Sequence, residues 1–217
     1  MVLLKKVKMA RGAAKVAGGV IVFGAHVLYR PKYVYVNRKL QNKRLRTPCV
    51  IIANHTSSRD GPFLMSVLTG TPTTSMIAKE WYENKKLNWL VEGYACIPVD
   101  RNGADISWLR QAIQQLKEGK SVIVFPEGFS NDSGKIAVFK PGFALLAHMA
   151  GVPILPICLD REYHAVGKRK RVMIGEPQWL TPPESGATQE YFQAEADRFQ
   201  RMIVQMQTKL DQVNSWI

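Results

Sequence analysis

The first 59 residues contain no aspartate or glutamate, although they hold thirteen lysine and arginine residues. Positions 60–217 hold seventeen basic and seventeen acidic residues, so the formal net charge of +13 belongs to the N-terminal quarter of the chain. A basic charge spread over the whole chain would suggest a nucleic-acid partner. Here the charge is confined to one segment, and we expect no nucleic-acid partner.

This basic segment also lacks an apolar run long enough to cross a bilayer. Its run Val16–Leu28 has thirteen residues, whereas a spanning helix needs about 20. Lysine and arginine lie on both sides of the run, at positions 5, 6, 8, 11 and 15 before it and at positions 30 and 32 after it. Such a segment is typical of a helix in the interface of an anionic membrane, here with Val20, Ile21, Phe23 and Leu28 immersed.

A cleaved signal peptide is the alternative interpretation, because it also has a basic start and a short apolar centre. The stretch after the run, Tyr29-Arg30-Pro31-Lys32-Tyr33, is basic and aromatic and offers no small-residue cleavage site. We therefore expect residues 1–32 to form an uncleaved membrane anchor and residues 33–217 to form the main domain. The expected location is the cytoplasmic face of the cell membrane, as a peripheral or monotopic protein.

Cysteine is scarce, and the three cysteines, Cys49, Cys96 and Cys158, lie far apart. Their spacing fits neither a disulfide framework nor a metal site, so we expect core residues in a reducing compartment and no bound metal. Nothing in residues 33–217 is typical of a linker, an internal repeat or a low-complexity segment. That stretch is therefore expected to form one compact domain.

Short apolar runs alternate with helical patterns along this domain, which predicts an α/β fold with a mixed or mostly parallel central sheet flanked by helices. The expected strands are Tyr33–Val36, Val50–Ala53, Ser75–Ala78, Ile97–Val99, Ser121–Phe125, Ile154–Cys158 and Val172–Ile174. One helix is expected from near Asp105 to Gly119, with Ile106, Leu109, Ile113 and Leu116 on one face.

A C-terminal helix is also expected, because apolar residues recur there at steps of three and four. They are Phe192, Ala196, Phe199, Ile203, Met206, Leu210, Val213 and Ile217. We assign this stripe to packing in the core or against a membrane, and to no chemistry.

The candidate chemistry begins with His55 and Asp60, which follow the apolar run Val50–Ala53. Residues five apart on a helix lie about 140° apart around the axis, so the two side chains can meet only across a turn. Gly61-Pro62 follow, and proline favours the first turn of a helix. An aspartate that holds one imidazole nitrogen leaves the other free to accept a proton, which predicts a general base with its orienting acid. The alternative is a capping aspartate beside a histidine that ends a strand.

Three further apolar runs are followed by charged residues or bracketed by prolines. Phe125-Pro126-Glu127-Gly128 follows one run, Asp100-Arg101 follows another, and a third, Val152–Pro156, is bracketed by prolines. In an open α/β sheet, ligands gather beyond the carboxyl ends of the strands. These positions are therefore candidates for substrate binding.

The order and spacing of these four blocks resemble the glycerolipid acyltransferase family, the lysophosphatidate acyltransferase type, over roughly residues 50 to 160. The family's first block, Asn-His-x-Ser-x-x-Asp, stands here as Asn54, His55, Ser57 and Asp60, and its Phe-Pro-Glu-Gly block is intact. The resemblance implies a family fold with an N-terminal helical element in the membrane, and acyl transfer as the activity.

The resemblance also implies roles for individual residues in acceptor binding. Arg101 matches the basic residue of the second block, and Glu127 and Gly128 match the acceptor-binding third block. The family commonly continues that third block with Thr-Arg-Ser, whereas this chain has Phe129-Ser130-Asn131. A basic residue often assigned to the acceptor phosphate is therefore missing, which leaves the head group of the acceptor open.

A phosphate on the acceptor requires cations, and the candidates are Arg101, Lys79 and Lys140. Glu127, an anion, is instead expected to accept from an acceptor hydroxyl or to orient Arg101 or Lys79. The basic run at 168–171 is expected to be a solvated loop, or a docking site for an acidic acyl carrier protein or for the phosphates of coenzyme A.

Together these features predict an enzyme that moves a fatty acyl group from acyl-coenzyme A or acyl carrier protein to a lysophospholipid, with lysophosphatidate the favoured acceptor and no cofactor. The acceptor hydroxyl attacks the thioester directly, and backbone amides near the start of the Asp60 helix are expected to stabilise the oxyanion. A covalent route through Ser57 or Ser58 is the alternative mechanism, although the chain has no Gly-x-Ser-x-Gly elbow. Another lysolipid, glycerol 3-phosphate, or a non-catalytic lipid-surface protein are the alternative functions.

Overall fold

The computed structural model describes residues 2–37, 39, 47–84, 96–100, 105–131, 133, 135–161, 169–183 and 186–212, and gives only the backbone of residues 2–15 and Tyr82. In this part of the chain seven strands form one sheet, in the order β1-β7-β6-β2-β5-β3-β4. The strands are β1 (Lys32–Tyr35), β2 (Val50–Ala53), β3 (Thr73–Ala78), β4 (Ile97–Val99), β5 (Ser121–Val124), β6 (Ile154–Leu159) and β7 (Arg171–Ile174). Each strand expected from the sequence is present.

Most of the sheet is parallel. β6, β2, β5, β3 and β4 run in one direction, so their carboxyl ends lie at the same edge. β7 is antiparallel to β6, and β1 is parallel to β7. The prediction of a mixed, mostly parallel sheet flanked by helices is confirmed.

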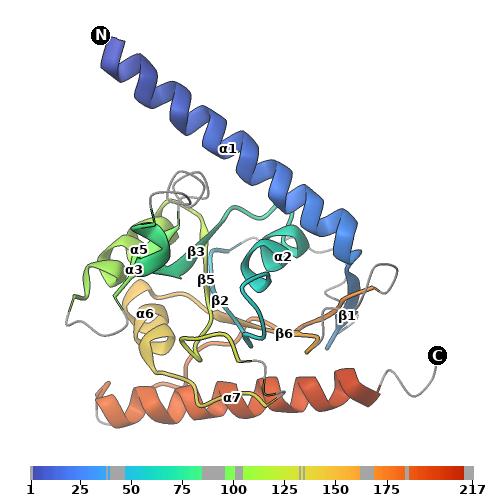
Figure 1. Cartoon of the computed structure of the whole chain (residues 1–217). Helices are drawn as coiled ribbons and strands as arrows, with labels where there is room; N and C mark the ends of the chain where they lie inside the picture. Colours follow the sequence, from blue (N-terminus) through green and yellow to red (C-terminus); the bar gives the residue numbers. More distant parts are fainter. Residues whose placement is uncertain are drawn as a thin grey trace.

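Helices cover both faces of the sheet (Figure 1). They are α1 (Val2–Tyr29), α2 (Asp60–Val67), α3 (Lys79–Tyr82), α5 (Ser107–Lys117), α6 (Gly142–Ala150) and α7 (Gln189–Gln212). α5, α6 and α7 share one apolar cluster with the sheet, whereas α2 and the end of α1 share the other. The central strands are therefore covered on both sides.

The sequence of β2 reflects its position between these two layers. Val50 and Ile52 pack in the cluster of α5, α6 and α7, whereas Ile51 packs with Phe63 of α2 in the other cluster. A parallel strand buried on both faces is apolar at every position, which explains the unbroken run in the sequence. Burying each of these aliphatic side chains contributes roughly 1.5–3 kcal/mol.

The apolar stripe of α7 is a packing face, as predicted. Its residues Phe192, Ala196, Phe199, Ile203, Met206 and Leu210 are all buried. Val213 and Ile217 lie outside the described residues.

The expected face of α5 is correct except at its first position. Leu109 and Leu116 are buried, but Ile106 is 67 % exposed. The helix begins one residue later, at Ser107, whose backbone N–H and hydroxyl both donate to the Asp105 carboxylate. Ile106 therefore precedes the helix instead of facing the core.

Helix α1 packs on α2 through its C-terminal part, and the rest of it extends past the body of the molecule (Figure 1). Ala25 is buried at this contact, and His26 Nδ1 lies 3.2 Å from the Ser66 carbonyl oxygen of α2. The apolar side chains of Val16, Val20, Phe23, Val27 and Leu28 are exposed. Among the described helices, none is both long and apolar enough to span a bilayer.

Candidate active site

The candidate site lies where the carboxyl ends of the parallel strands meet. His55 follows β2, Lys79 follows β3, and Glu127 follows β5 by three residues. Asn54 joins two of these ends, because its amide nitrogen donates to the Leu159 carbonyl (3.0 Å) and its oxygen accepts the Leu159 N–H (2.7 Å). No structural role was predicted for Asn54, but its side chain fixes the end of β2 against the end of β6.

His55 and Asp60 meet across the turn between β2 and α2. His55 Nδ1 lies 3.0 Å from Asp60 Oδ2, and Asp60 is fully buried as the first residue of α2. The same carboxylate oxygen accepts the backbone N–H groups of Thr56 (2.6 Å) and Ser57 (2.8 Å). Because this oxygen acts as an acceptor, Nδ1 carries the proton and Nε2 keeps its lone pair.

The orientation of the His55 ring is fixed from a second side. The ring stacks on Phe125, with 4.2 Å between centroids and 21° between planes. The side chain remains 19 % exposed and lines the cavity described below. A contact on Nδ1 and one on the ring face leave the imidazole little rotational freedom.

Glu127 holds two backbone amides that the sequence did not predict. Its Oε1 accepts the His55 N–H (2.7 Å) and its Oε2 accepts the Ala137 N–H (2.8 Å), and the residue is 2 % exposed. Burial raises the pKa of this carboxyl, although the two N–H donors act in the opposite direction. Both oxygens thus hold backbone amides, one of which belongs to His55. That Glu127 also accepts from an acceptor hydroxyl or orients Arg101 or Lys79 stays a prediction.

Gly128 and Lys140 lie against each other at the cavity wall. Gly128 has a φ of +78°, and a Cβ at this position would lie 3.2 Å from Lys140 Nζ and 3.3 Å from its Cε. Glycine is therefore favoured here by its backbone conformation, and a side chain at this position would also displace the end of Lys140 slightly. Lys140 lines the cavity with its side chain across Gly128.

The other two cations proposed for a phosphate are placed differently. Lys79 pairs with Glu83 at 3.6 Å on the exposed side of α3, while its neighbours Ala78 and Trp81 line the cavity. Arg101 lies outside the described residues. That Lys79 or Arg101 binds a phosphate stays a prediction.

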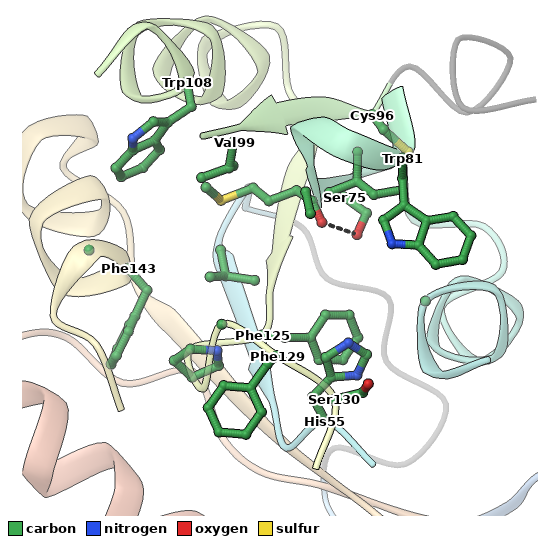
Figure 2. Close-up of a pocket in the computed structure, with 18 of the residues that line it drawn as sticks. His55, Ser75, Trp81, Cys96, Val99, Trp108, Phe125, Phe129, Ser130 and Phe143 are labelled. Atoms are coloured by element: carbon green, nitrogen blue, oxygen red, sulfur yellow. Dashed lines mark hydrogen bonds between the residues drawn. The ribbon is translucent and has the colours of Figure 1, made fainter. Parts of the chain in front are cut away.

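A cavity of about 590 Å³ lies in front of His55. In Figure 2, His55, Phe125 and Ser130 lie at one end of it and Trp108 and Val99 at the other. Its apolar lining includes Met65, Met76, Trp81, Trp108, Phe129 and Phe143. A pocket of this size and character suits a largely hydrophobic ligand.

The three cysteines are free, and none is suited to act as a nucleophile. Cys96 lines the cavity, but burial raises the pKa of its thiol to about 12. Burial raises the pKa of Cys49 to about 11, and it also raises that of Cys158. At neutral pH all three remain protonated, and the thiol is a far weaker nucleophile than the thiolate.

The turn before α2 uses its amides internally. The amides of Thr56 and Ser57 bind Asp60, the Asp60 N–H donates to the Ser57 carbonyl (3.0 Å), and the Arg59 N–H donates to Ser57 Oγ (3.3 Å). These four amides are therefore engaged within the turn, and that backbone amides near the start of α2 stabilise an oxyanion stays a prediction. The Ser57 hydroxyl oxygen accepts a hydrogen bond within the turn, whereas Ser58 lines the cavity.

The basic run at 168–171 is structural in its described part. Lys170 is buried, and Arg171 forms a buried pair with Asp160. Arg169 donates to the carbonyl oxygens of Arg30 (3.1 Å) and Pro31 (3.0 Å). Lys170 and Arg171 therefore do not belong to the expected solvated or docking surface, whereas Arg169 is exposed and Lys168 lies outside the described residues.

The site has an imidazole that is fixed by a buried carboxylate and lines an apolar cavity at the edge of an α/β sheet. Such a site is typical of proteins that carry out base-assisted chemistry on a hydrophobic substrate. A family model described as Acyltransferase matches residues 33–160, more than half of the chain. The protein belongs to this acyltransferase family.

Relatives and a solved structure point the same way. The chain is 35 % identical over 160 residues to human 1-acyl-sn-glycerol-3-phosphate acyltransferase alpha, covering 70 % of this chain and 56 % of that protein. It is 32 % identical over 146 residues to a probable 1-acyl-sn-glycerol-3-phosphate acyltransferase of Mycoplasma genitalium, covering 65 % and 53 %. The chain thus spans about half the length of these curated relatives.

The fold is similar to that of the 1-acyl-sn-glycerophosphate (LPA) acyltransferase PlsC from Thermotoga maritima. The TM-score is 0.55 at 22 % sequence identity, over 92 % of this chain and 78 % of that one. At this identity the likeness supports the architecture described above.

Proposed function

We propose that this protein is a 1-acyl-sn-glycerol-3-phosphate acyltransferase, which moves a fatty acyl group from a thioester to the free hydroxyl of a lysophospholipid and gives phosphatidate. The strongest support is the His55–Asp60 pair, 3.0 Å apart, at the wall of an apolar cavity of about 590 Å³. The names of the relatives agree with this substrate. Acyl-coenzyme A or acyl carrier protein is the proposed donor, with no cofactor.

The proposed mechanism begins at His55 Nε2. This nitrogen takes the proton of the acceptor hydroxyl while the hydroxyl oxygen forms a bond to the thioester carbonyl carbon. The tetrahedral intermediate collapses, the carbon–sulfur bond breaks, and the imidazolium returns its proton to the departing thiolate. Asp60 stabilises the imidazolium, and Glu127 holds the His55 backbone through the 2.7 Å hydrogen bond.

Thiol release from palmitoyl-coenzyme A in anionic micelles tests this function. Release that depends on lysophosphatidate supports it, and the same assay with other lysolipids, glycerol 3-phosphate and acyl carrier protein donors maps the preference. If no combination of donor and acceptor gives acceptor-dependent release, the proposed enzymatic function is refuted and a non-catalytic lipid-binding protein remains.

Lys140 is proposed to bind the acceptor phosphate, because it is a cation at the cavity wall close to the strand end that carries Glu127. Lys140→Met keeps the packing of the stem against Gly128 and removes the charge. We expect the KM for lysophosphatidate to rise about tenfold with kcat nearly unchanged, since a hydrogen bond to a charged group contributes about 1.5–3 kcal/mol. Steady-state kinetics against lysophosphatidate and uncharged monoacylglycerol measure the effect.

The matched control for Lys140 is Lys117→Met, which alters an exposed lysine of α5. Its KM for lysophosphatidate is expected to equal that of the parent. An unchanged KM in Lys140→Met, or an equal rise with the uncharged acceptor, would remove Lys140 from the phosphate site.

Residues 1–32 are proposed to bind an anionic membrane surface at the cytoplasmic face of the cell membrane. The support is a helix with exposed apolar side chains, Phe23 being 69 % exposed, in a segment without acidic residues. We expect Phe23→Glu to lower binding to anionic vesicles about tenfold or more, measured by co-sedimentation. Val204→Glu, which alters an exposed valine of α7, is the control and should bind as the parent does. Equal binding of all three proteins would contradict the anchor.

A further inference from the structure

Lys170 is a lysine in the interior of the protein, 1 % exposed. Its backbone joins three elements, because its N–H donates to the Tyr29 carbonyl at the end of α1 and its carbonyl accepts the Lys32 N–H of β1, both at 2.9 Å, just before β7 begins. A lysine is almost never fully buried unless its ammonium has partners. The buried ammonium of Lys170 is therefore expected to have specific partners.

The ammonium lies against α2, the helix that begins with Asp60. Lys170 Nζ donates to the Asp160 carbonyl oxygen (2.8 Å) and lies 5.6 Å from the centroid of the Phe63 ring. Phe63 is three residues after Asp60 in α2, so both side chains occupy the same side of that helix. Asp60 accordingly interacts electrostatically with the ammonium.

The carboxylate of Asp160 is already matched by another cation. Arg171 Nε lies 2.9 Å from Asp160 Oδ2, and Arg171 Nη2 lies 3.2 Å from Asp160 Oδ1. Lys170 contacts only the backbone oxygen of Asp160 among the hydrogen bonds described. Both aspartates act electrostatically on Lys170, and the effect of Asp60 is the larger of the two.

The surroundings of Lys170 show that holding a charge there is costly. Burial lowers its pKa to about 8, while the negative charges of Asp60 and Asp160 oppose this shift. Cys158 acts in the same sense as the two aspartates, and Arg59 in the opposite one. A methionine would pack against Phe63 without this desolvation cost, so packing alone does not account for the lysine.

We propose that Lys170 is a positioning residue, whose buried ammonium holds Asp60 ionised behind His55 and opposes the uptake of a proton by the pair. The inference rests on the proposed function, in which His55 must be neutral to accept the hydroxyl proton. Glu127 is hydrogen-bonded to the His55 backbone and is a second carboxyl of this site. Its ionised form favours a protonated imidazole, whereas the Lys170 cation disfavours it. Lys170 thus extends the active range of the base toward lower pH.

Two neutral variants separate charge from hydrogen bonding. Lys170→Gln keeps an N–H donor for the Asp160 carbonyl, whereas Lys170→Met keeps only the apolar stem. In both, the acid limb of the kcat/KM profile is expected to move to higher pH by about one unit, because a cation that opposed protonation is gone. Lys170→Arg keeps the charge, and its profile should overlie that of the parent.

A purely structural lysine would change the plateau of this profile without moving its midpoint. Superimposable acid limbs in the parent and in the neutral variant that folds would overturn the proposal. Should the parent transfer no acyl group, the proposed function fails, but the titration of the His55 ring followed by NMR still tests Lys170. A midpoint that moves up in Lys170→Gln supports the inference there, and an unmoved midpoint refutes it.

Discussion

Replacement of His55 with alanine is expected to lower the kcat of acyl transfer by about 10³-fold or more. A neutral alcohol is a poor nucleophile, and a positioned general base contributes roughly 10²–10⁴ in rate. The structure leaves His55 Nε2 with its lone pair at the cavity wall, held by Asp60 on one side and by Phe125 on the ring face. Thiol release from palmitoyl-coenzyme A with saturating lysophosphatidate measures the loss.

Three variants control this result. His148→Ala alters a histidine that contacts the Tyr191 and Phe192 rings and should leave kcat unchanged. Ser57→Ala and Ser58→Ala test the covalent route and should retain most of the turnover. An acyl ester trapped on Ser58, together with loss of turnover in its alanine variant, would replace direct attack by the covalent mechanism.

The positions of His55 and Asp60 were accessible from the sequence for two physical reasons. An unbroken apolar run such as Val50–Ala53 identifies a strand buried on both faces, and the carboxyl ends of parallel strands meet at one edge. The five-residue spacing then excludes a shared helical face and requires a turn. Both inferences depend only on neighbouring residues.

The role of Glu127 was not accessible in this way. A carboxylate at a strand end resembles a ligand-binding group, and the sequence does not show that its second oxygen meets the N–H of Ala137, ten residues further along. That contact depends on the path of the loop after β5. The sequence therefore located Glu127 at the site but did not reveal the two backbone amides that its carboxylate holds.

The interpretation of the basic run at 168–171 as a surface was wrong for Lys170 and Arg171, for a related reason. Adjacent basic residues usually indicate a solvated surface, but the antiparallel register of β6 and β7, with Leu159 opposite Val172, brings Arg171 beside Asp160. The acidic partner of Arg171 is eleven residues away and immediately follows β6. Only the sheet topology shows that Lys170 and Arg171 are interior residues.

Replacement of Asp60 with asparagine is expected to lower kcat about 10²- to 10⁴-fold while the protein still folds. Asp60 Oδ2 accepts the Nδ1–H of His55 and the N–H groups of Thr56 and Ser57. An asparagine retains one acceptor oxygen but loses the charge that stabilises the imidazolium and fixes the tautomer. Circular dichroism and thermal unfolding verify the fold, and the thiol-release assay measures kcat.

A double variant and the pH profile test whether Asp60 acts through His55. Because His55 and Asp60 act as one unit, His55→Ala with Asp60→Asn should be no slower than His55→Ala alone. Losing an anion beside the imidazole disfavours its protonated form, so the acid limb of Asp60→Asn should move to lower pH. Losing the Lys170 cation should move it to higher pH. Shifts in the same direction for Asp60→Asn and Lys170→Gln would contradict the opposed roles of the two charges around His55.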